Sequence, residues 1–176
     1  MRINCIPVEY LADQHLRAEW VEMLMLPAYL KRSINSKNGL ILYEGSEYTL
    51  NSGHARFFYN KLAYVEKRYK EIEIEMNKRG FKTNPTLNLS EFPKVLYNDW
   101  IPTEADMINN LNRILTRIYE KPLWYTFYGK VFPEGAIRKA TTDYTGLSFS
   151  SWKTFYSDRF INYKYALKIS DIKKRG

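Results

Sequence analysis

The sequence predicts an all-α fold, organised as a single compact domain of three helices. Apolar residues recur at intervals of three and four in three separate stretches, and this spacing places them on one face of a helix. Between these stretches Gly, Pro and Asn are frequent, which is typical of loops. A chain of 176 residues is long enough for a buried core. The predicted helices span Leu11 to about Arg32, Gly53 to Arg79, and Thr103 to Lys121.

The first predicted helix carries two apolar stripes, so we expect it to pack on several sides. One stripe consists of Leu16, Trp20, Met23 and Pro27, and the other of Leu11, His15, Ala18, Glu22, Met25 and Leu26. His15 and Glu22 thus interrupt a stripe that should be buried. A carboxylate there is either a satisfied structural group or one that reaches solvent, or it faces a cleft with a catalytic or electrostatic role. We expect Asp13 to cap this helix and Pro27 to kink or interrupt it.

The N-terminal segment, Met1 to Tyr10, is predicted to be extended because Pro7 disfavours a regular helix. The second helix is expected to be capped by Asn51 or Ser52 and to stop at Gly80 in the C′ position. Its core stripe is Phe58, Leu62, Val65, Tyr69, Ile72 and Met76. Its cations are expected on a solvated face; they are Lys61, Lys67, Arg68, Lys70 and Lys78.

The third helix begins with an acidic first turn after Thr103, which complements the helix dipole. Its predicted buried stripe is Ile108, Leu111, Leu115 and Ile118. Arg113, Arg117 and Lys121 follow at intervals of four, a spacing at which like charges repel. Such a row is either a solvated outer face or a set of phosphate contacts.

Residues 123–130, LWYTFYGK, combine four aromatic rings with a lysine. This stretch suits an edge strand, a core plug or a base-stacking surface. We expect residues 1–130 to form the helical domain. Residues 131–176, with 9 Lys and Arg against 4 Asp and Glu, are expected to form a basic, aromatic extension packed on it, with short β-leaning pieces that suggest a small hairpin.

The chain has a net charge of +8 and contains 15 Tyr, 9 Phe and 4 Trp. Cations interleaved with aromatic rings suggest a nucleic-acid partner, although a basic surface also favours solubility. Cys5 is the single cysteine, which excludes an internal disulfide and a multi-cysteine zinc site. With two histidines in the chain, a His-rich metal site is unsupported. No apolar run is long enough for a membrane span and no signal peptide is evident, so we expect a cytoplasmic protein.

Seven segments, taken together, resemble the phage pyrimidine-dimer DNA glycosylases of the endonuclease V kind, in the family's order and nearly its spacing. They are RIN at 2–4, LADQHL at 11–16, Glu22, GH with RFFYNKL at 53–62, KRGF at 78–81, IPTEA at 101–105 and WYTFYGK at 124–130. The resemblance covers residues 1–130. It implies three helices with the N-terminal segment threaded between them, no cofactor, double-stranded DNA as the partner and a monomer.

The resemblance also implies a reaction and its residues. The N-terminal amine, here that of Met1, attacks C1′ of the damaged nucleotide, a Schiff base forms, and β-elimination cuts the strand. Glu22 matches the family's catalytic carboxylate. The expected DNA-binding residues, from the resemblance and from the basic and aromatic pattern together, are Arg2, Gln14, His15, Arg113, Arg117, Lys121, Trp124, Tyr125, Tyr128 and Lys130.

Three features depart from the family pattern. Met1 stands where the family has a small Thr exposed by removal of the initiator Met, and Arg2 is too bulky for normal removal. Either the Met1 amine is the nucleophile, or the amine is misplaced and lyase activity is lost. Val21 and Met25 replace two arginines that flank the catalytic Glu, and the extension 131–176 has no counterpart. A cyclobutane dimer is therefore the default substrate, with another modified pyrimidine also open. A non-catalytic module that binds distorted or modified DNA is the alternative function.

Overall fold

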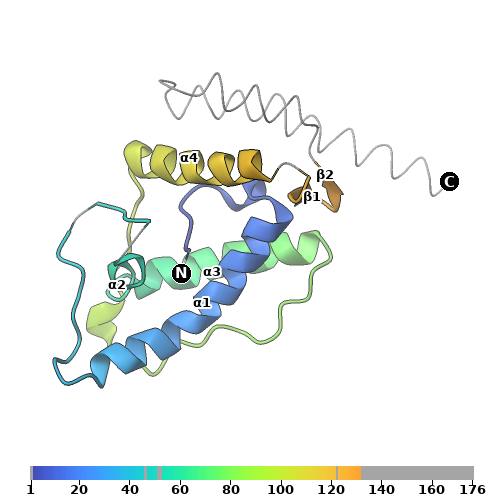
Figure 1. The fold of residues 1–176 in the computed structure, drawn as a ribbon. Helices are drawn as coiled ribbons and strands as arrows, with labels where there is room; N and C mark the ends of the chain where they lie inside the picture. Colours follow the sequence, from blue (N-terminus) through green and yellow to red (C-terminus); the bar gives the residue numbers. More distant parts are fainter. Residues whose placement is uncertain (1, 46, 51–52, 122, 132–176) are drawn as a thin grey trace. The chain divides into compact units, whose positions relative to one another are not determined.

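A computed structural model of the chain describes residues 2–45, 47–50, 53–121 and 123–131. The all-α fold class is confirmed, since helices dominate these residues and the strands form only a two-stranded ribbon (Figure 1). The chain divides into two compact units, Met1–Asp106 and Met107–Gly176. In chain order the elements are η1 (Val8–Tyr10), α1 (Asp13–Ile34), α2 (His54–Phe57), α3 (Leu62–Lys78), η2 (Lys94–Leu96), α4 (Glu104–Glu120), β1 (Thr126–Phe127) and β2 (Lys130–Val131).

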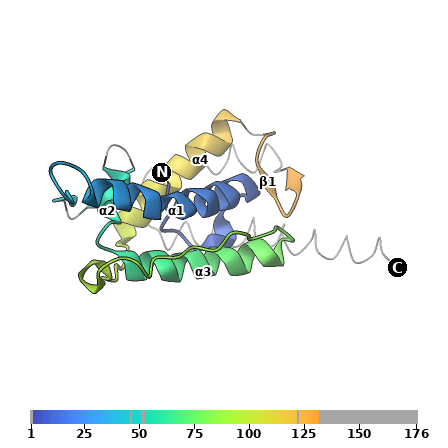
Figure 2. The same cartoon turned by 90° about the horizontal axis from the view of Figure 1, so that it is seen from below.

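Helix α1 packs against α3, and Figure 2 shows the two helices side by side. Two ion pairs between them set their relative direction. Arg68 binds Glu19, whereas Arg79, eleven residues later and just after the end of α3, binds Asp13 at the start of α1. The two helices are therefore antiparallel.

The predicted burial of two faces of α1 is confirmed in part. The stripe of Leu16, Trp20 and Met23 is buried, as is Leu30. On the other stripe Leu11 and Leu26 are buried, whereas His15, Ala18 and Glu22 are only partly buried and Met25 is exposed. The predicted cap is wrong, because Asp13 is the first residue of α1 and its carboxylate makes an ion pair with Arg79 instead.

Of the kink or interruption predicted at Pro27, the interruption is wrong, because α1 continues without a break to Ile34; the kink stays a prediction. A proline inside a helix costs about 3 kcal/mol, from the lost hydrogen bond and a steric clash. Leu26 and Leu30 lie on either side of it and are fully buried. Burial of a leucine side chain is worth about 1.5–3 kcal/mol, so these two residues offset the proline.

The single helix predicted over 53–79 is divided in two, because a turn at residues 58–61 separates α2 from α3. Phe57, Phe58 and Tyr59 are all buried. Successive residues of a helix point about 100° apart, so one helix could not direct three consecutive rings into the same core. The N-cap of α2 is Gly53, at φ +99°, rather than Asn51 or Ser52, which lie outside the described residues.

The core stripe and the end of α3 are confirmed. Phe58, Leu62, Val65, Tyr69, Ile72 and Met76 are all buried. Gly80 follows the helix at φ +80°, its N–H donates to the carbonyl of Asn77, and the N–H of Phe81 donates to that of Met76. This pair of bonds is the Schellman motif. The residue just after the helix adopts a left-handed backbone conformation in this motif and is usually glycine. Residues 81–102 hold no regular element except η2, as predicted.

Helix α4 begins with a reciprocal cap. The Asp106 N–H donates to Oγ1 of Thr103 (3.2 Å), and the Asp106 carboxylate accepts from the Thr103 N–H (2.9 Å). Of the predicted stripe, Leu111 and Ile118 are buried and Ile108 is partly buried, while the side chain of Leu115 lies outside the described part of the chain. Asn110 and Ile114 are buried in addition.

Residues 123–131 form a short hairpin, in which Thr126 pairs with Val131 and Phe127 with Lys130. Tyr128 and Gly129 make the two-residue turn, with φ of 50° and 76°. Positive φ at both positions is typical of the type I′ turn that suits the twist of a hairpin. The predicted β-leaning pieces of residues 131–176 fall outside the described residues beyond Val131. None of the helices described is long and apolar enough to cross a membrane.

Candidate active site

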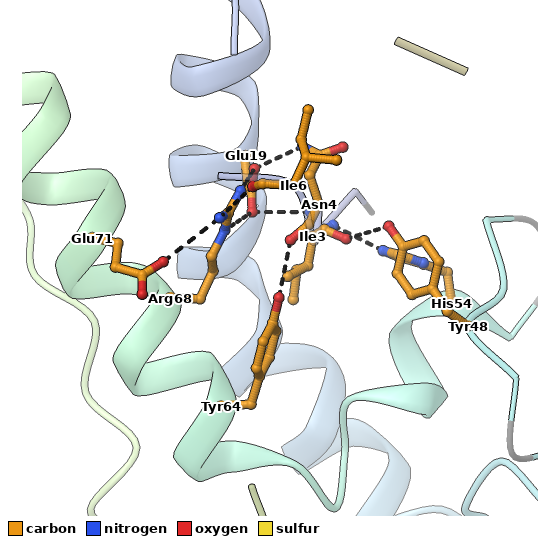
Figure 3. A network of polar contacts seen from close by, with 9 residues as sticks. All are labelled: Ile3, Asn4, Ile6, Glu19, Tyr48, His54, Tyr64, Arg68 and Glu71. Carbon is orange, nitrogen blue, oxygen red and sulfur yellow. Dashed lines mark hydrogen bonds and ion pairs between the residues drawn. The ribbon is translucent and has the colours of Figure 1, made fainter. Parts of the chain in front are cut away.

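The N-terminal segment runs through the interior of the first unit. Ile3, Asn4, Cys5 and Ile6 are all buried. Buried backbone groups need hydrogen-bond partners, and Figure 3 shows how side chains from α1, α2, α3 and the loop before α2 supply them. The segment is thus fixed by side-chain contacts rather than by pairing in a sheet.

Five side chains form hydrogen bonds with Ile3, Asn4 and Ile6 of this segment. His54 accepts from the Ile3 N–H (2.8 Å) and the Tyr48 hydroxyl donates to the Ile3 carbonyl (2.7 Å). Glu19 accepts from the Asn4 N–H (2.9 Å), and the Tyr64 hydroxyl donates to the Asn4 carbonyl (3.2 Å). Arg68 donates to the Ile6 carbonyl (2.7 Å).

Glu19 and Arg68 form the centre of this network. Arg68 binds both carboxylate oxygens, through Nε at 2.9 Å and Nη2 at 3.2 Å, and Nδ2 of Asn4 donates to Oε2 at 2.6 Å. Glu19 is 0% and Arg68 3% exposed. Burial disfavours the charged guanidinium, but the Glu19 carboxylate, together with Tyr64 and Glu71, more than compensates for this effect and raises the pKa of Arg68. Glu19 is therefore a structural carboxylate that organises the N-terminal segment.

The N-terminal segment runs in the direction of Glu22. Asn4 donates to Glu19, whereas the backbone carbonyls of Glu9 and Leu11 accept from Arg79, the partner of Asp13 at the start of α1. The segment therefore runs antiparallel to α1, and residues before Asn4 lead toward the C-terminal half of that helix. Glu22 lies three residues beyond Glu19, about 4.5 Å further along the helix axis.

The other predicted site residues of the first unit are partly accessible. Glu22, Gln14 and His15 are partly buried, and Arg2 is exposed. His15 lies seven residues before Glu22, about 10 Å away along the axis of α1 and on nearly the same face. Met1 lies outside the described residues.

Apolar side chains stand beside Glu22 on α1. Val21 is 47% and Met25 43% exposed. Both are adjacent to Glu22, by one residue or by one turn of the helix. The accessible margin of α1 around this carboxylate is therefore apolar rather than cationic.

The predicted site residues of the second unit differ in exposure. Arg117 is exposed and makes an ion pair with Glu120 at 3.0 Å, Lys121 is exposed, and Arg113 is partly buried. Trp124 is 64% exposed, so its ring is available for stacking. Tyr125 is buried, which makes its ring a core group, and Tyr128 is partly buried. The side chain of Lys130 lies outside the described part of the chain.

Sequence reasoning missed Glu19, His54 and Arg68. The placement of Arg68 on a solvated face is wrong, because it is buried against Glu19. The signal was present in the periodicity. Glu19 lies three residues after Leu16 and four before Met23, and Arg68 lies three after Val65 and four before Ile72. Each charged residue therefore falls on the buried stripe of its helix, and the two helices pack together.

Cys5 is not a nucleophile in this site. Burial is the largest influence on the thiol and raises its pKa well above the usual range, so the reactive thiolate is not formed near neutral pH. Among the residues that the structure describes, no three His, Cys, Asp or Glu side chains are grouped so that they could hold a metal ion.

A family model described as pyrimidine dimer DNA glycosylase matches residues 1–89. The match includes the N-terminal segment, α1, α2 and α3, and with them every residue of the network in Figure 3. Glu22, Gln14, His15 and Arg2 also lie within it.

Proposed function

The chain belongs to the pyrimidine dimer DNA glycosylase family, and we propose that it acts on DNA through its N-terminal amine. In this proposal it removes a damaged pyrimidine, by default a cyclobutane pyrimidine dimer, and then cleaves the strand at the abasic site. Met1 supplies the amine and Glu22 the carboxylate.

The observation that carries the proposal is the fixed N-terminal segment. Chain termini are usually poorly ordered unless they are tied down. Here Ile3 to Ile6 are buried and held by five side chains, and the segment leads toward the half of α1 that bears Glu22. A reaction between a protein amine and a sugar carbon gains rate when the amine is held in place. The network supports this use of the terminus, since DNA binding alone does not need a buried segment.

The chemistry suits an α-amine. Its reference pKa is about 7.7–8.0, so a useful fraction is neutral near physiological pH, unlike a lysine. The neutral nitrogen attacks C1′ and the bond from C1′ to the base breaks, with the bonding electrons leaving on the base, which is then protonated. The nitrogen loses a proton and the sugar ring opens to give the protonated Schiff base. Loss of a C2′ proton then expels the 3′ phosphate oxygen.

Glu22 has two roles in this scheme. Its carboxylate stabilises the positive charge that develops on the sugar and on the iminium nitrogen. It can also move a proton during ring opening. Partial burial supports both roles, because a charge that is partly shielded from water interacts more strongly with a nearby cation.

Borohydride trapping tests the proposal. The protein, with Met1 as its first residue, is incubated with a duplex that carries an abasic site or a cyclobutane dimer, and borohydride is added to reduce the Schiff base. We expect a covalent protein–DNA product. A variant with one residue added before Met1 should give none, whereas one residue added after Gly176 should not affect trapping. Duplex binding that weakens with salt, without trapping on any lesion, would instead indicate a non-catalytic DNA-binding module.

The apolar neighbours of Glu22 give a prediction about DNA affinity. Val21→Arg with Met25→Arg should tighten duplex binding and steepen its salt dependence, because each new phosphate contact adds about 0.9 to the slope of log K against log salt. Both positions are exposed, so folding should be little affected. Fluorescence anisotropy over a salt series measures the change. The matched control is Ile74→Arg with Val95→Arg, which adds the same charge at exposed apolar positions on α3 and η2; an equal effect there would refute a local role for Val21 and Met25.

A further inference from the structure

We propose that His54 is a positioning residue for the N-terminal amine, with the lone pair of its Nε2 fixing the peptide of Ile3. This inference rests on the function proposed above and concerns how the nucleophile is held. His54 does not touch the DNA or the reacting atoms in this proposal. It acts through Ile3, the first buried residue in the described part of the segment.

The partners of His54 assign its tautomer. Nδ1 lies within hydrogen-bond distance of the Thr49 carbonyl, which can only accept, so Nδ1 carries the proton. Nε2 then has the lone pair and accepts from the Ile3 N–H at 2.8 Å. The ring is therefore neutral, with each nitrogen in a single role.

Packing fixes the plane of the ring. His54 is buried and contacts the rings of Tyr48 and Phe58 edge to face, at centroid distances of 5.5 and 5.2 Å. Tyr48 also donates to the Ile3 carbonyl at 2.7 Å. Both polar groups of Ile3 are thus held by adjacent side chains of an aromatic cluster, as Figure 3 shows.

The position of Ile3 in the segment gives this contact its importance. Glu19 holds Asn4 and Arg68 holds Ile6, both deeper in the chain. Ile3 is followed toward the terminus by Arg2, which is exposed. Two residues of chain span at most about 7 Å, so the orientation of the Ile3 peptide limits where the amine can reach. A misplacement of about 1 Å at a reacting group can lower a rate on the order of 10²-fold.

Two substitutions separate the two nitrogens of the ring. The amide of Gln extends to about the place of Nε2, so His54→Gln keeps an acceptor for Ile3. The shorter amide of Asn reaches only about the place of Nδ1, so His54→Asn keeps a donor for Thr49 and loses the acceptor. The test compares the single-turnover trapping rate on an abasic duplex and the DNA concentration that gives half the maximal rate. Unfolding in urea checks the stability of each variant.

We expect His54→Asn to lower the saturating rate about 10²-fold with the half-saturating DNA concentration unchanged, and His54→Gln to stay within about tenfold of wild type. In hydrogen exchange the Ile3 amide should lose protection in His54→Asn while the Asn4 amide keeps it. Equal rates for the two variants, both folded, would overturn the inference and leave the function intact. Absence of trapping in the wild-type protein would overturn both.

Tyr48→Phe keeps the proposal testable if both His54 variants fail to fold. It removes the hydroxyl that donates to the Ile3 carbonyl and keeps the ring that packs on His54, Phe57 and Phe58. The trapping rate at saturating DNA should fall by more than threefold. The DNA concentration that gives half the maximal rate should again stay unchanged. A rate equal to wild type would contradict control of the amine through Ile3.

Discussion

Glu22→Gln is expected to lower the single-turnover rate of strand cleavage by about 10²–10⁴-fold, the range typical of a lost acid–base group. Glutamine keeps the shape of the side chain but carries no negative charge and cannot transfer a proton at neutral pH. Glu22 is only partly buried, so the substitution should change the free energy of unfolding little. The rate is measured at saturating abasic duplex, and affinity separately by anisotropy. Affinity should stay within about threefold, because phosphate contacts dominate binding to a duplex.

Glu44→Gln is the matched control, because Glu44 is an exposed carboxylate in the loop between α1 and α2. It removes the same charge from the same unit without touching α1, and its rate should equal that of wild type. A Glu22→Gln protein that keeps a tenth or more of the wild-type rate would show that Glu22 is not the catalytic carboxylate. A large loss of affinity together with the loss of rate would assign Glu22 to substrate binding instead.

The helical fold could be predicted from the sequence because it depends on local signals. The core stripe of α3 and its end at Gly80 follow from periodicity and from the left-handed conformation that glycine adopts readily. The capped start of α4 at Thr103 follows from side-chain chemistry in one turn. Each of these features needs only residues close together in the chain.

The errors arose where distant contacts decide the outcome. Pro27 stays within α1 because burial of its neighbours, Leu26 and Leu30, depends on other parts of the fold. The turn between α2 and α3 depends on three consecutive aromatic side chains that must all be buried. In both cases tertiary packing outweighs the local preference.

The candidate site shows the same division. Glu22 could be named as a candidate, since it interrupts an apolar stripe and lies within a set of ordered motifs, and its catalytic role stays a prediction. Glu19 and Arg68 could not be paired without the packing of α1 on α3, since 49 residues separate them. The contact of His54 with Ile3 could not be predicted either, because the two residues are 51 positions apart in the chain. The family resemblance pointed to a threaded N-terminal segment, and the side chains that hold it came from the structure.

Arg68→Met is expected to reduce the free energy of unfolding by about 3–5 kcal/mol, the range for removing one partner of a buried ion pair. The variant leaves the Glu19 carboxylate fully buried without its counter-charge and removes the donor to the Ile6 carbonyl. Chemical denaturation in urea measures the loss. Lys67→Met is the matched control on the neighbouring residue, because Lys67 pairs with Asp99 at 2.7 Å but its side chain is 58% exposed. An exposed pair contributes about 0–1 kcal/mol, so the control should remain close to wild type.

The charge left on Glu19 makes a further comparison possible. Adding Glu19→Gln to Arg68→Met removes the isolated charge while keeping an amide oxygen near the Asn4 N–H. The double variant should therefore be more stable than Arg68→Met alone, even though it carries one more substitution. Equal stability of the two would show that the main loss lies in the Ile6 bond and in packing. A loss of stability from Arg68→Met no larger than that from Lys67→Met would contradict the structural role given to the pair.

Because Glu19 also holds Asn4, trapping by Arg68→Met should fall even at temperatures where the protein remains folded.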